Sequence, residues 1–155
     1  MPTLIVLRHA KAVAGLGVVD FDRPLADRGR RDAAATGDWL RAEGLVPVLA
    51  LCSTAVRTRQ TLDLLDLKTE VSHEARLYDN EPEIVLDLVR QTGDDVGTLL
   101  VVGHNPSTHQ VVHDLTGDAP ESFPTCALAV IELTAPWAET WPGGGALTTF
   151  RTPKD

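Results

Sequence analysis

The sequence has few cysteines and no long apolar run. Its two cysteines, Cys52 and Cys126, lie far apart and show no metal-binding spacing, and Cys52 is expected to be a small core residue. The apolar stretch Thr3–Leu7 has five residues, whereas a membrane helix needs roughly 20. No basic region precedes this stretch and no cleavage site follows it, as a signal peptide would require. We therefore expect a cytoplasmic protein that does not associate with membranes and in which a disulfide is disfavoured.

Basic residues are also scarce. The chain has 14 Lys and Arg against 22 Asp and Glu, a formal net charge of −8. General nucleic-acid binders are usually basic, so we expect no nucleic-acid partner. A phosphate substrate remains compatible with this charge, because a local cluster of Arg and His can be positive inside an acidic protein. The hydrophobic fraction of 43% and the length of 155 residues fit one globular domain, residues 1–155.

Strand signals alternate with helix signals along the chain. This alternation predicts an α/β domain with a mostly parallel central sheet. Strands are expected at Thr3–Leu7, Val48–Cys52, Glu70–Ser72, Thr98–Gly103, Ala127–Leu133 and Ala146–Phe150. Helices are expected at Asp27–Gly44, from about Ala55 to Leu65, at Pro82–Gln91 and from Asn105 to Gly117. The residues expected to cap helix N-termini are Asp27, Ser53 or Thr54, and Asn105.

Polar residues follow three of the predicted strands directly. They are Arg8-His9, Ser53 with Arg57, and His104-Asn105. In an open parallel sheet, ligands bind at the edge formed by the carboxyl ends of the strands. A single histidine after a strand is usually structural. Two histidines and two arginines at equivalent strand ends instead favour a functional site.

These residue types suit phosphate chemistry. The planar fork of an arginine matches the oxygens of a phosphoryl group, and Arg57 adds the positive end of a helix. A neutral imidazole is a good nucleophile towards phosphorus, and a second, protonated histidine can stabilise the developing charge. The sequence thus predicts a phosphatase in which His9 forms a covalent phosphohistidine and Arg8, Arg57 and His104 hold the phosphate. No metal or other cofactor is required.

Three motifs carry a resemblance to a known family. The segments Leu7-Arg8-His9-Ala10, Ser53-Thr-Ala-Val-Arg57 and Val102-Gly103-His104-Asn105-Pro106 resemble, in order, the motifs of the histidine phosphatase superfamily, also called phosphoglycerate mutase-like. The resemblance extends from Thr3 to about Gly117. It implies a three-layer α/β/α sandwich, a phosphorylated His9, and phosphate binding by Arg8, Arg57 and His104.

Within that superfamily the chain is most similar to the small SixA branch of phosphohistidine phosphatases. The chain is too short for the large helical insertion of bigger members. The stretch from Asp20 to Gly29 is similar to the Asp-x-x-Arg-Pro-Leu-x-x-x-Gly segment of that branch. Ala26 departs from the family, which commonly has Thr there as a helix cap, and Asp27 is expected to replace it. The resemblance implies a phosphorylated partner protein as substrate.

The proton donor is left open by the sequence. Larger family members place a carboxylic acid beside the leaving group. Here Glu81 and Asp22 are the candidates for a donor, together with Asp79 and Glu83, and each is otherwise a solvated loop carboxylate. A phosphohistidine expels imidazole, whose pKa is about 6.5, and therefore needs a donor less than an alkyl phosphate does.

Two further residues are expected to bind substrate. Arg23 either points into the site or forms a surface ion pair with Asp20 or Asp22. Ser53 either binds substrate or caps its helix.

Alternative functions remain at this stage. The same fold could serve a small-molecule phosphomonoesterase, or a phosphate-dependent binding module without turnover. The pair Asp20 and Asp22 loosely matches the Asp-x-Asp motif of metal-dependent phosphatases, but no strand precedes it. His109 and His113 have the spacing of metal ligands, yet no third ligand lies nearby in the sequence. The partner is expected to be a phosphorylated protein or a small phosphate ester, and the chain is expected to be a monomer.

Overall fold

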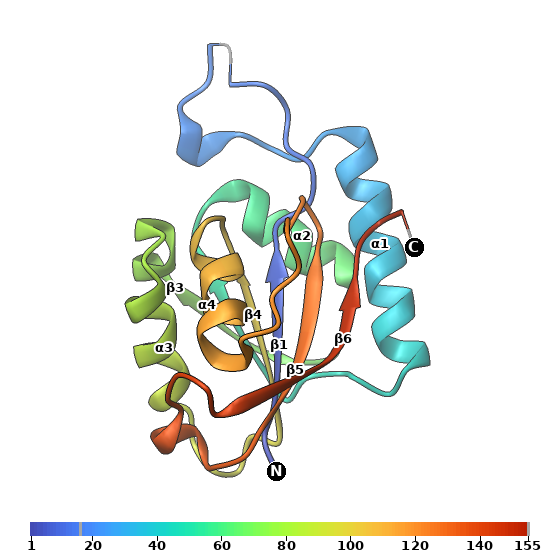
Figure 1. Cartoon of the computed structure of the whole chain (residues 1–155). Coiled ribbons are helices and arrows are strands. Elements are labelled where there is room, and N and C mark those ends of the chain that lie inside the picture. The colour runs from blue at the N-terminus through green and yellow to red at the C-terminus, as the bar shows by residue number, and fades with distance from the viewer. Residues whose placement is uncertain (16, 155) are drawn as a thin grey trace.

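A mixed sheet forms the centre of the fold in the computed structural model, which describes residues 1–15 and 17–154 (Figure 1). Its strand order is β3-β2-β4-β1-β5-β6. The strands are β1 (Thr3–Arg8), β2 (Leu49–Ser53), β3 (Glu70–Glu74), β4 (Thr98–Gly103), β5 (Leu128–Leu133) and β6 (Gly145–Arg151). Strands β1 to β4 are parallel to one another, while β5 is antiparallel to its neighbours β1 and β6. The sheet is therefore mostly parallel, as the sequence predicts.

Helices cover both faces of this sheet (Figure 1). The four α-helices in the described residues are α1 (Asp27–Ala42), α2 (Val56–Leu65), α3 (Pro82–Arg90) and α4 (Ser107–Thr116). Side chains alternate between faces along a strand. Accordingly Ile5 packs with residues of α1 and α2, whereas its neighbour Leu4 packs with residues of α3 and α4. The predicted three-layer α/β/α sandwich is confirmed.

The register of the strands brings the predicted polar clusters to one edge. Arg8 of β1 lies opposite Gly103 of β4, and Cys52 of β2 lies opposite Val102 of β4. The residues that immediately follow these strands therefore emerge side by side. The segment that joins β1 to α1 rises above this edge and contains the short helix η1 (Asp20–Asp22) (Figure 1). A second short helix, η2 (Ala75–Asp79), follows β3.

The helix caps differ from the sequence predictions. Ala26 stands at the cap position of α1 without a side-chain cap, and Asp27 is already inside the first turn. Helix α2 begins after Ala55, which has no side-chain cap, and the Ser53 side chain is hydrogen-bonded to His104 across the sheet edge. Helix α4 begins after Pro106, so the side chain of Asn105 is too early in the chain to cap it.

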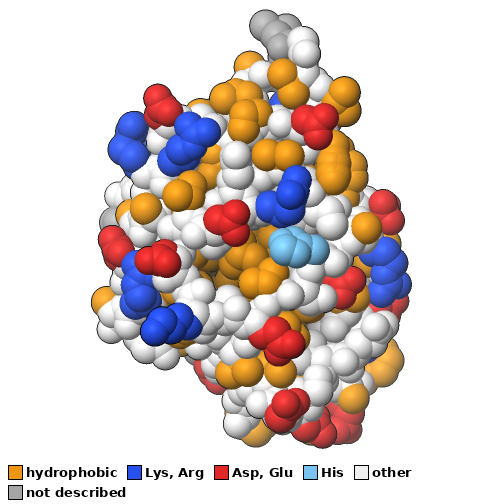
Figure 2. Space-filling model, turned by 180° about the vertical axis from the view of Figure 1, so that it is seen from behind, with side chains coloured by type: hydrophobic (Ala, Val, Ile, Leu, Met, Phe, Trp, Pro, Cys, Tyr) orange, Lys and Arg blue, Asp and Glu red, His pale blue; other side chains and the backbone are white. Residues whose placement is uncertain are grey.

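Charged side chains of both signs are interspersed on the face of the molecule shown in Figure 2. Basic groups there lie beside acidic ones, and hydrophobic side chains occupy much of the surface between them (Figure 2). Within residues 1–15 and 17–154, every helix is too short or too polar to cross a bilayer.

Candidate active site

A polar cavity of about 390 Å³ lies at the carboxyl-end edge of the sheet. The residues that line it come from the ends of β1 and β4, the start of α2, the segment between β1 and α1, and η2 with the residue after it. They are Arg8, His9, Asp20, Arg23, Arg57, Tyr78, Asn80, His104 and Asn105. Four residues predicted from strand ends, Arg8, His9, Arg57 and His104, thus share one cavity.

His9 is held in a defined tautomer at the end of β1. Its Nδ1 atom lies 2.7 Å from the carbonyl oxygen of Ala10. A carbonyl only accepts hydrogen bonds, so Nδ1 carries the proton and Nε2 keeps a free lone pair. The side chain is only 7% exposed. Burial, helped by the positive charge of Arg57 and Arg8, lowers the pKa of His9 to about 3, although the bond to Ala10 acts in the opposite direction. His9 is therefore neutral at pH 7.

His104 lies beside His9, with their ring centroids 5.4 Å apart. Its Nδ1 atom is 3.4 Å from Nη2 of Arg57, and its Nε2 atom is 2.8 Å from Oγ of Ser53. A guanidinium only donates, so Nδ1 accepts and Nε2–H donates to Ser53. Burial, followed by the charge of Arg57, lowers the pKa of His104 to about 4. His104 is therefore neutral in the free site, and its hydrogen bond to Ser53 fixes the orientation of the ring.

Arg8 and Arg57 retain unpaired donors. Nη1 of Arg8 donates to the carbonyl of Phe123 at 3.2 Å, and Nη1 of Arg57 donates to the carbonyl of Asp20 at 2.8 Å. The Nε atoms of both arginines are buried and have no hydrogen-bond partner among the described residues. Leaving a buried donor unpaired is costly. Both guanidinium groups also line the cavity, so they present positive charge and N–H donors to it.

Asp20 is a cavity residue for which the sequence gives no catalytic prediction. Its Oδ2 atom accepts hydrogen bonds from the hydroxyl of Tyr78 at 2.6 Å and from Nη2 of Arg57 at 3.2 Å, while Oδ1 accepts from Arg23 at 3.1 Å. The bond from Tyr78, together with the charge of Arg57, holds the pKa of Asp20 at about 2. This carboxyl group is therefore ionised at neutral pH. The only sequence signal for it is its spacing from Arg23.

Arg23 fits both alternatives that the sequence leaves open, an ion pair with a nearby aspartate and a place in the site. It pairs with Asp20, and it also lines the cavity. Its Nη1 atom donates to the carbonyl of Val13 at 3.0 Å, which fixes the side chain against the segment between β1 and α1. The side chain is 24% exposed, so part of the guanidinium remains accessible from the cavity mouth.

The four carboxylates considered as proton donors lie outside the cavity lining. Asp22, Asp79, Glu81 and Glu83 are all exposed. Of the cavity-lining residues that the structure describes, Asp20 is the one carboxylate.

Asn80 is a second cavity residue missed by the sequence analysis. Its Oδ1 atom accepts the backbone N–H of Ser107 at 3.0 Å, and its amide donates to the carbonyl of Asn105. Asn80 thus performs the capping role that the sequence analysis gives to Asn105. The Asn105 amide instead donates to the carbonyl of Phe123 at 2.8 Å, the same acceptor that holds Arg8. These bonds join η2, α4 and the segment before β5 around the site.

Comparison with known proteins agrees with this geometry. The sequence profile of the histidine phosphatase superfamily (branch 1) matches residues 4–81. The chain belongs to this superfamily. An uncharacterized protein of Mycobacterium tuberculosis (strain H37Rv) is 41% identical over 158 residues, covering 96% of this chain and 100% of the relative. An uncharacterized chloroplastic protein of Arabidopsis thaliana is 29% identical, covering 97% of this chain and 77% of the relative.

Solved structures place this histidine phosphatase in the SixA-like branch. A Nakamurella multipartitia protein assigned as the phosphohistidine phosphatase SixA has a TM-score of 0.91 and 32% identity, covering 99% of this chain and 97% of that one. A protein histidine phosphatase SixA complexed with tungstate has a TM-score of 0.83 and 24% identity, covering 98% and 97%. The second likeness shows agreement in fold.

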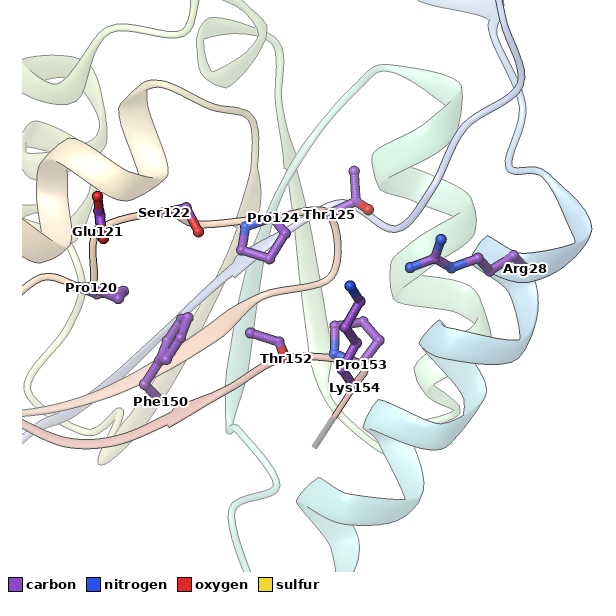
Figure 3. A pocket seen from close by; sticks show the side chains of 10 residues that line it. All are labelled: Arg28, Pro120, Glu121, Ser122, Pro124, Thr125, Phe150, Thr152, Pro153 and Lys154. Atoms are coloured by element: carbon purple, nitrogen blue, oxygen red, sulfur yellow. The ribbon is translucent and has the colours of Figure 1, made fainter.

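A second cavity of the histidine phosphatase, about 410 Å³ in volume, lies between the segment after α4, the end of β6 and α1. In Figure 3 the side chain of Arg28 approaches it from α1, and Phe150 lies on its opposite side. Lys154 is its other basic residue. Its described lining contains neither histidine nor cysteine, so the residues suited to phosphoryl transfer lie in the first cavity.

The two cysteines are buried thiols. Burial raises the pKa of Cys52 to about 12 and that of Cys126 to about 11. His109, considered above as a possible metal ligand, has other contacts. Its Nε2 atom lies 2.7 Å from the carbonyl oxygen of Pro120, and its ring stacks on Phe123.

Proposed function

We propose that this histidine phosphatase hydrolyses phosphohistidine in a partner protein, through a covalent phosphohistidine on His9 and without a metal. The observation that carries the proposal is the hydrogen bond from His9 Nδ1 to the carbonyl of Ala10. It leaves the Nε2 lone pair available in a cavity that also contains two arginines with unpaired donors.

The first half of the reaction transfers the phosphoryl group to the enzyme. Arg8 and Arg57 bind the phosphoryl oxygens through their guanidinium groups, which line the cavity. His9 Nε2 attacks phosphorus, a P–N bond forms, and the bond to the leaving group breaks with its electron pair on the leaving atom. The negative charge of the phosphoryl group raises the pKa of His104, which then donates to an equatorial oxygen.

The second half releases phosphate. Water attacks phosphorus, and the electron pair of the broken P–N bond returns to His9 Nε2. The Nδ1 proton stays on the ring throughout, hydrogen-bonded to Ala10. His9 therefore leaves as neutral imidazole and needs no proton from an external acid.

The leaving-group side of the cavity favours phosphohistidine over an alkyl phosphate. An alkoxide must be protonated as it leaves, whereas a phosphohistidine expels imidazole, whose pKa is about 6.5. Among the described residues that line the cavity, Asp20 is the one carboxylate, and its pKa of about 2 makes it a poor acid at neutral pH. The similarity to a protein assigned as the phosphohistidine phosphatase SixA also supports phosphohistidine as the substrate.

The test compares a phosphohistidine-bearing protein with a panel of sugar phosphates. The wild-type enzyme is expected to dephosphorylate the protein at a kcat/KM at least tenfold higher than for any sugar phosphate, with and without a metal chelator. His9→Ala is expected to abolish turnover and retain phosphate binding, whereas His113→Ala, an exposed control on α4, is expected to retain activity.

Each other outcome contradicts a defined part of the proposal. Higher turnover of a sugar phosphate would indicate a small-molecule phosphomonoesterase. Phosphate binding without any turnover by the wild-type enzyme would indicate a binding module. Loss of activity on chelation would contradict the metal-independent mechanism.

A further inference from the structure

We propose that Asp20 accepts a hydrogen bond from the second ring nitrogen of the substrate phosphohistidine and so selects the imidazolium form of that substrate. The inference rests on the proposed function, because it concerns the leaving group of the same reaction. It assigns a specificity-determining role to a residue whose side chain lies at the cavity mouth and is 54% exposed.

The chemistry of the leaving group requires such an acceptor. An imidazole leaves phosphorus as a neutral ring only when its other nitrogen carries a proton. The enzyme meets this requirement for His9, because the carbonyl of Ala10 accepts the Nδ1 proton at 2.7 Å. A substrate histidine undergoes the same bond cleavage on the opposite side of the phosphorus. It needs an equivalent acceptor, and an anionic one also stabilises the positive charge of the ring.

Asp20 has the contacts expected of an acceptor. Tyr78, Arg57 and Arg23 all donate to its carboxylate, at 2.6, 3.2 and 3.1 Å. A carboxylate that accepts from three donors is held in its ionised form and cannot act as the proton donor. Within the described lining of the cavity, it is the one anionic side chain beside five potentially cationic ones, three arginines and two histidines.

Substrate binding changes the charges around Asp20. In the free site the Nη2 atom of Arg57 donates to Asp20. A phosphoryl group that binds Arg57 competes with Asp20 for the same guanidinium. The carboxylate then loses a cationic donor, and the imidazolium N–H of the substrate can replace it. A neutral alkyl leaving group cannot supply this charge, so the exchange favours phosphohistidine.

The walls of the mouth suit a flat ring. Tyr78 lines the cavity and meets His104 edge-on, with 5.7 Å between the ring centroids, and Phe21, outside the lining, lies 5.2 Å from Tyr78 on the same measure. The hydroxyl of Tyr78 donates a hydrogen bond to Asp20, which holds the ring next to the carboxylate. An imidazole packed against Tyr78 would present its edge nitrogens to the carboxylate.

The step balances without an added reagent. His9 Nε2 forms a bond to phosphorus while the bond from phosphorus to the substrate nitrogen breaks. The electron pair remains on that nitrogen, and the other ring nitrogen keeps its proton, hydrogen-bonded to Asp20. The substrate histidine leaves as neutral imidazole.

The test compares two substrates in two variants. Asp20→Asn and Asp20→Ala are expected to lower kcat/KM for a phosphohistidine peptide at least tenfold, and to change kcat/KM for p-nitrophenyl phosphate less than threefold. The second substrate expels a stable phenolate and has no ring N–H, so its turnover also shows that the variant is folded. Asp22→Asn, which removes an exposed carboxylate in the same short helix, is the matched control.

The pH profile adds a second readout. The wild-type kcat for the phosphohistidine peptide is expected to fall as pH rises through the pKa of the imidazolium in the enzyme–substrate complex, where Asp20 contacts the ring. This alkaline limb should move to lower pH in Asp20→Asn, because the carboxylate no longer stabilises the cation.

Three outcomes overturn the inference. Equal losses on both substrates would show that Asp20 only positions Arg57. Wild-type kcat/KM values for both substrates in Asp20→Asn and Asp20→Ala would show that Asp20 makes no productive contact with the ring. If the wild-type enzyme hydrolyses p-nitrophenyl phosphate and not the peptide, the proposed function itself fails, and the role of Asp20 fails with it.

Discussion

The Nε2 atom of His104 lies 2.8 Å from Oγ of Ser53, although the two residues are 51 positions apart in the chain. Ser53 ends β2, His104 follows β4, and these strands are neighbours in the sheet. The bond fixes the His104 tautomer, because the other ring nitrogen faces a guanidinium that only donates. A residue expected to bind substrate or cap a helix instead orients a histidine of the site.

Replacing Ser53 by Ala is therefore expected to lower kcat by about tenfold, the equivalent of about 1.4 kcal/mol, with a smaller change in KM. Without Oγ, the His104 ring can turn or change tautomer, and its donor is no longer held in place. Steady-state kinetics measure the effect, with Thr54→Ala as the neighbouring control. Equal kcat values for Ser53→Ala and the wild-type enzyme would show that the bond is dispensable.

Arg57→Lys tests the geometry of the phosphate site separately from its charge. Lysine keeps the positive charge but lacks the planar fork and the Nε donor, so kcat/KM is expected to fall about 100-fold. The affinity for inorganic phosphate should fall in parallel, measured by calorimetry. Arg59→Lys on the exposed side of α2 is the matched control. Full activity in Arg57→Lys would mean that charge alone is sufficient.

Acid is expected to destabilise the fold through the two buried histidines. Their pKa values are about 3 for His9 and about 4 for His104, whereas an unfolded histidine has a pKa near 6.5. The unfolded chain therefore binds more protons than the native one below pH 6.5. The free energy of unfolding is constant above this pH and falls as pH decreases towards the folded pKa values.

At pH 5 the loss amounts to at most about 2 kcal/mol for each histidine. Urea denaturation at pH 7.5 and pH 5 measures it. His9→Gln and His104→Gln should each flatten the pH dependence, whereas His113→Gln on the exposed face of α4 should leave it unchanged. A slope that is the same in all three variants would assign the acid sensitivity to other groups.

Ala26→Thr is expected to stabilise the protein by about 1 kcal/mol. Ala26 has the extended backbone of a cap residue, with φ −74° and ψ 165°, and no side chain bonds the free N–H groups of α1. A threonine hydroxyl would supply that bond. Thermal unfolding compares it with Ala35→Thr, an exposed position inside α1, where threonine costs a few tenths of a kcal/mol. A lower melting temperature in Ala26→Thr would contradict the cap.

The meeting of Arg8, His9, Arg57 and His104 in one cavity could be predicted from the sequence because these residues lie at or just after the ends of strands. Arg8, His9 and His104 lie at the ends of apolar runs that are easy to recognise. Parallel pairing then places those ends together without any knowledge of the loops. The same reasoning predicts the sandwich and most of its element boundaries.

The part of the cavity around Asp20 and Tyr78 could not be predicted in this way. Asp20 and Tyr78 are 58 positions apart, and both lie in short irregular segments without hydrophobic periodicity. Their meeting depends on how these segments pack over the sheet edge. The predicted caps were wrong for a related reason, since the side chains of Ser53 and Asn105 also bond to groups far away in the chain, His104 and Phe123, which the sequence does not show as neighbours.

This division between strand ends and loops bears on how the enzyme could diverge. The carbonyl of Phe123 accepts hydrogen bonds from both Arg8 and Asn105, so a change on this side of the cavity would disturb several bonds at once. The side of the cavity with Asp20 and Tyr78 consists of surface segments joined by a few side-chain contacts. Substitutions in those segments could therefore change which substrate the enzyme prefers during evolution. The residues at the strand ends would remain the same.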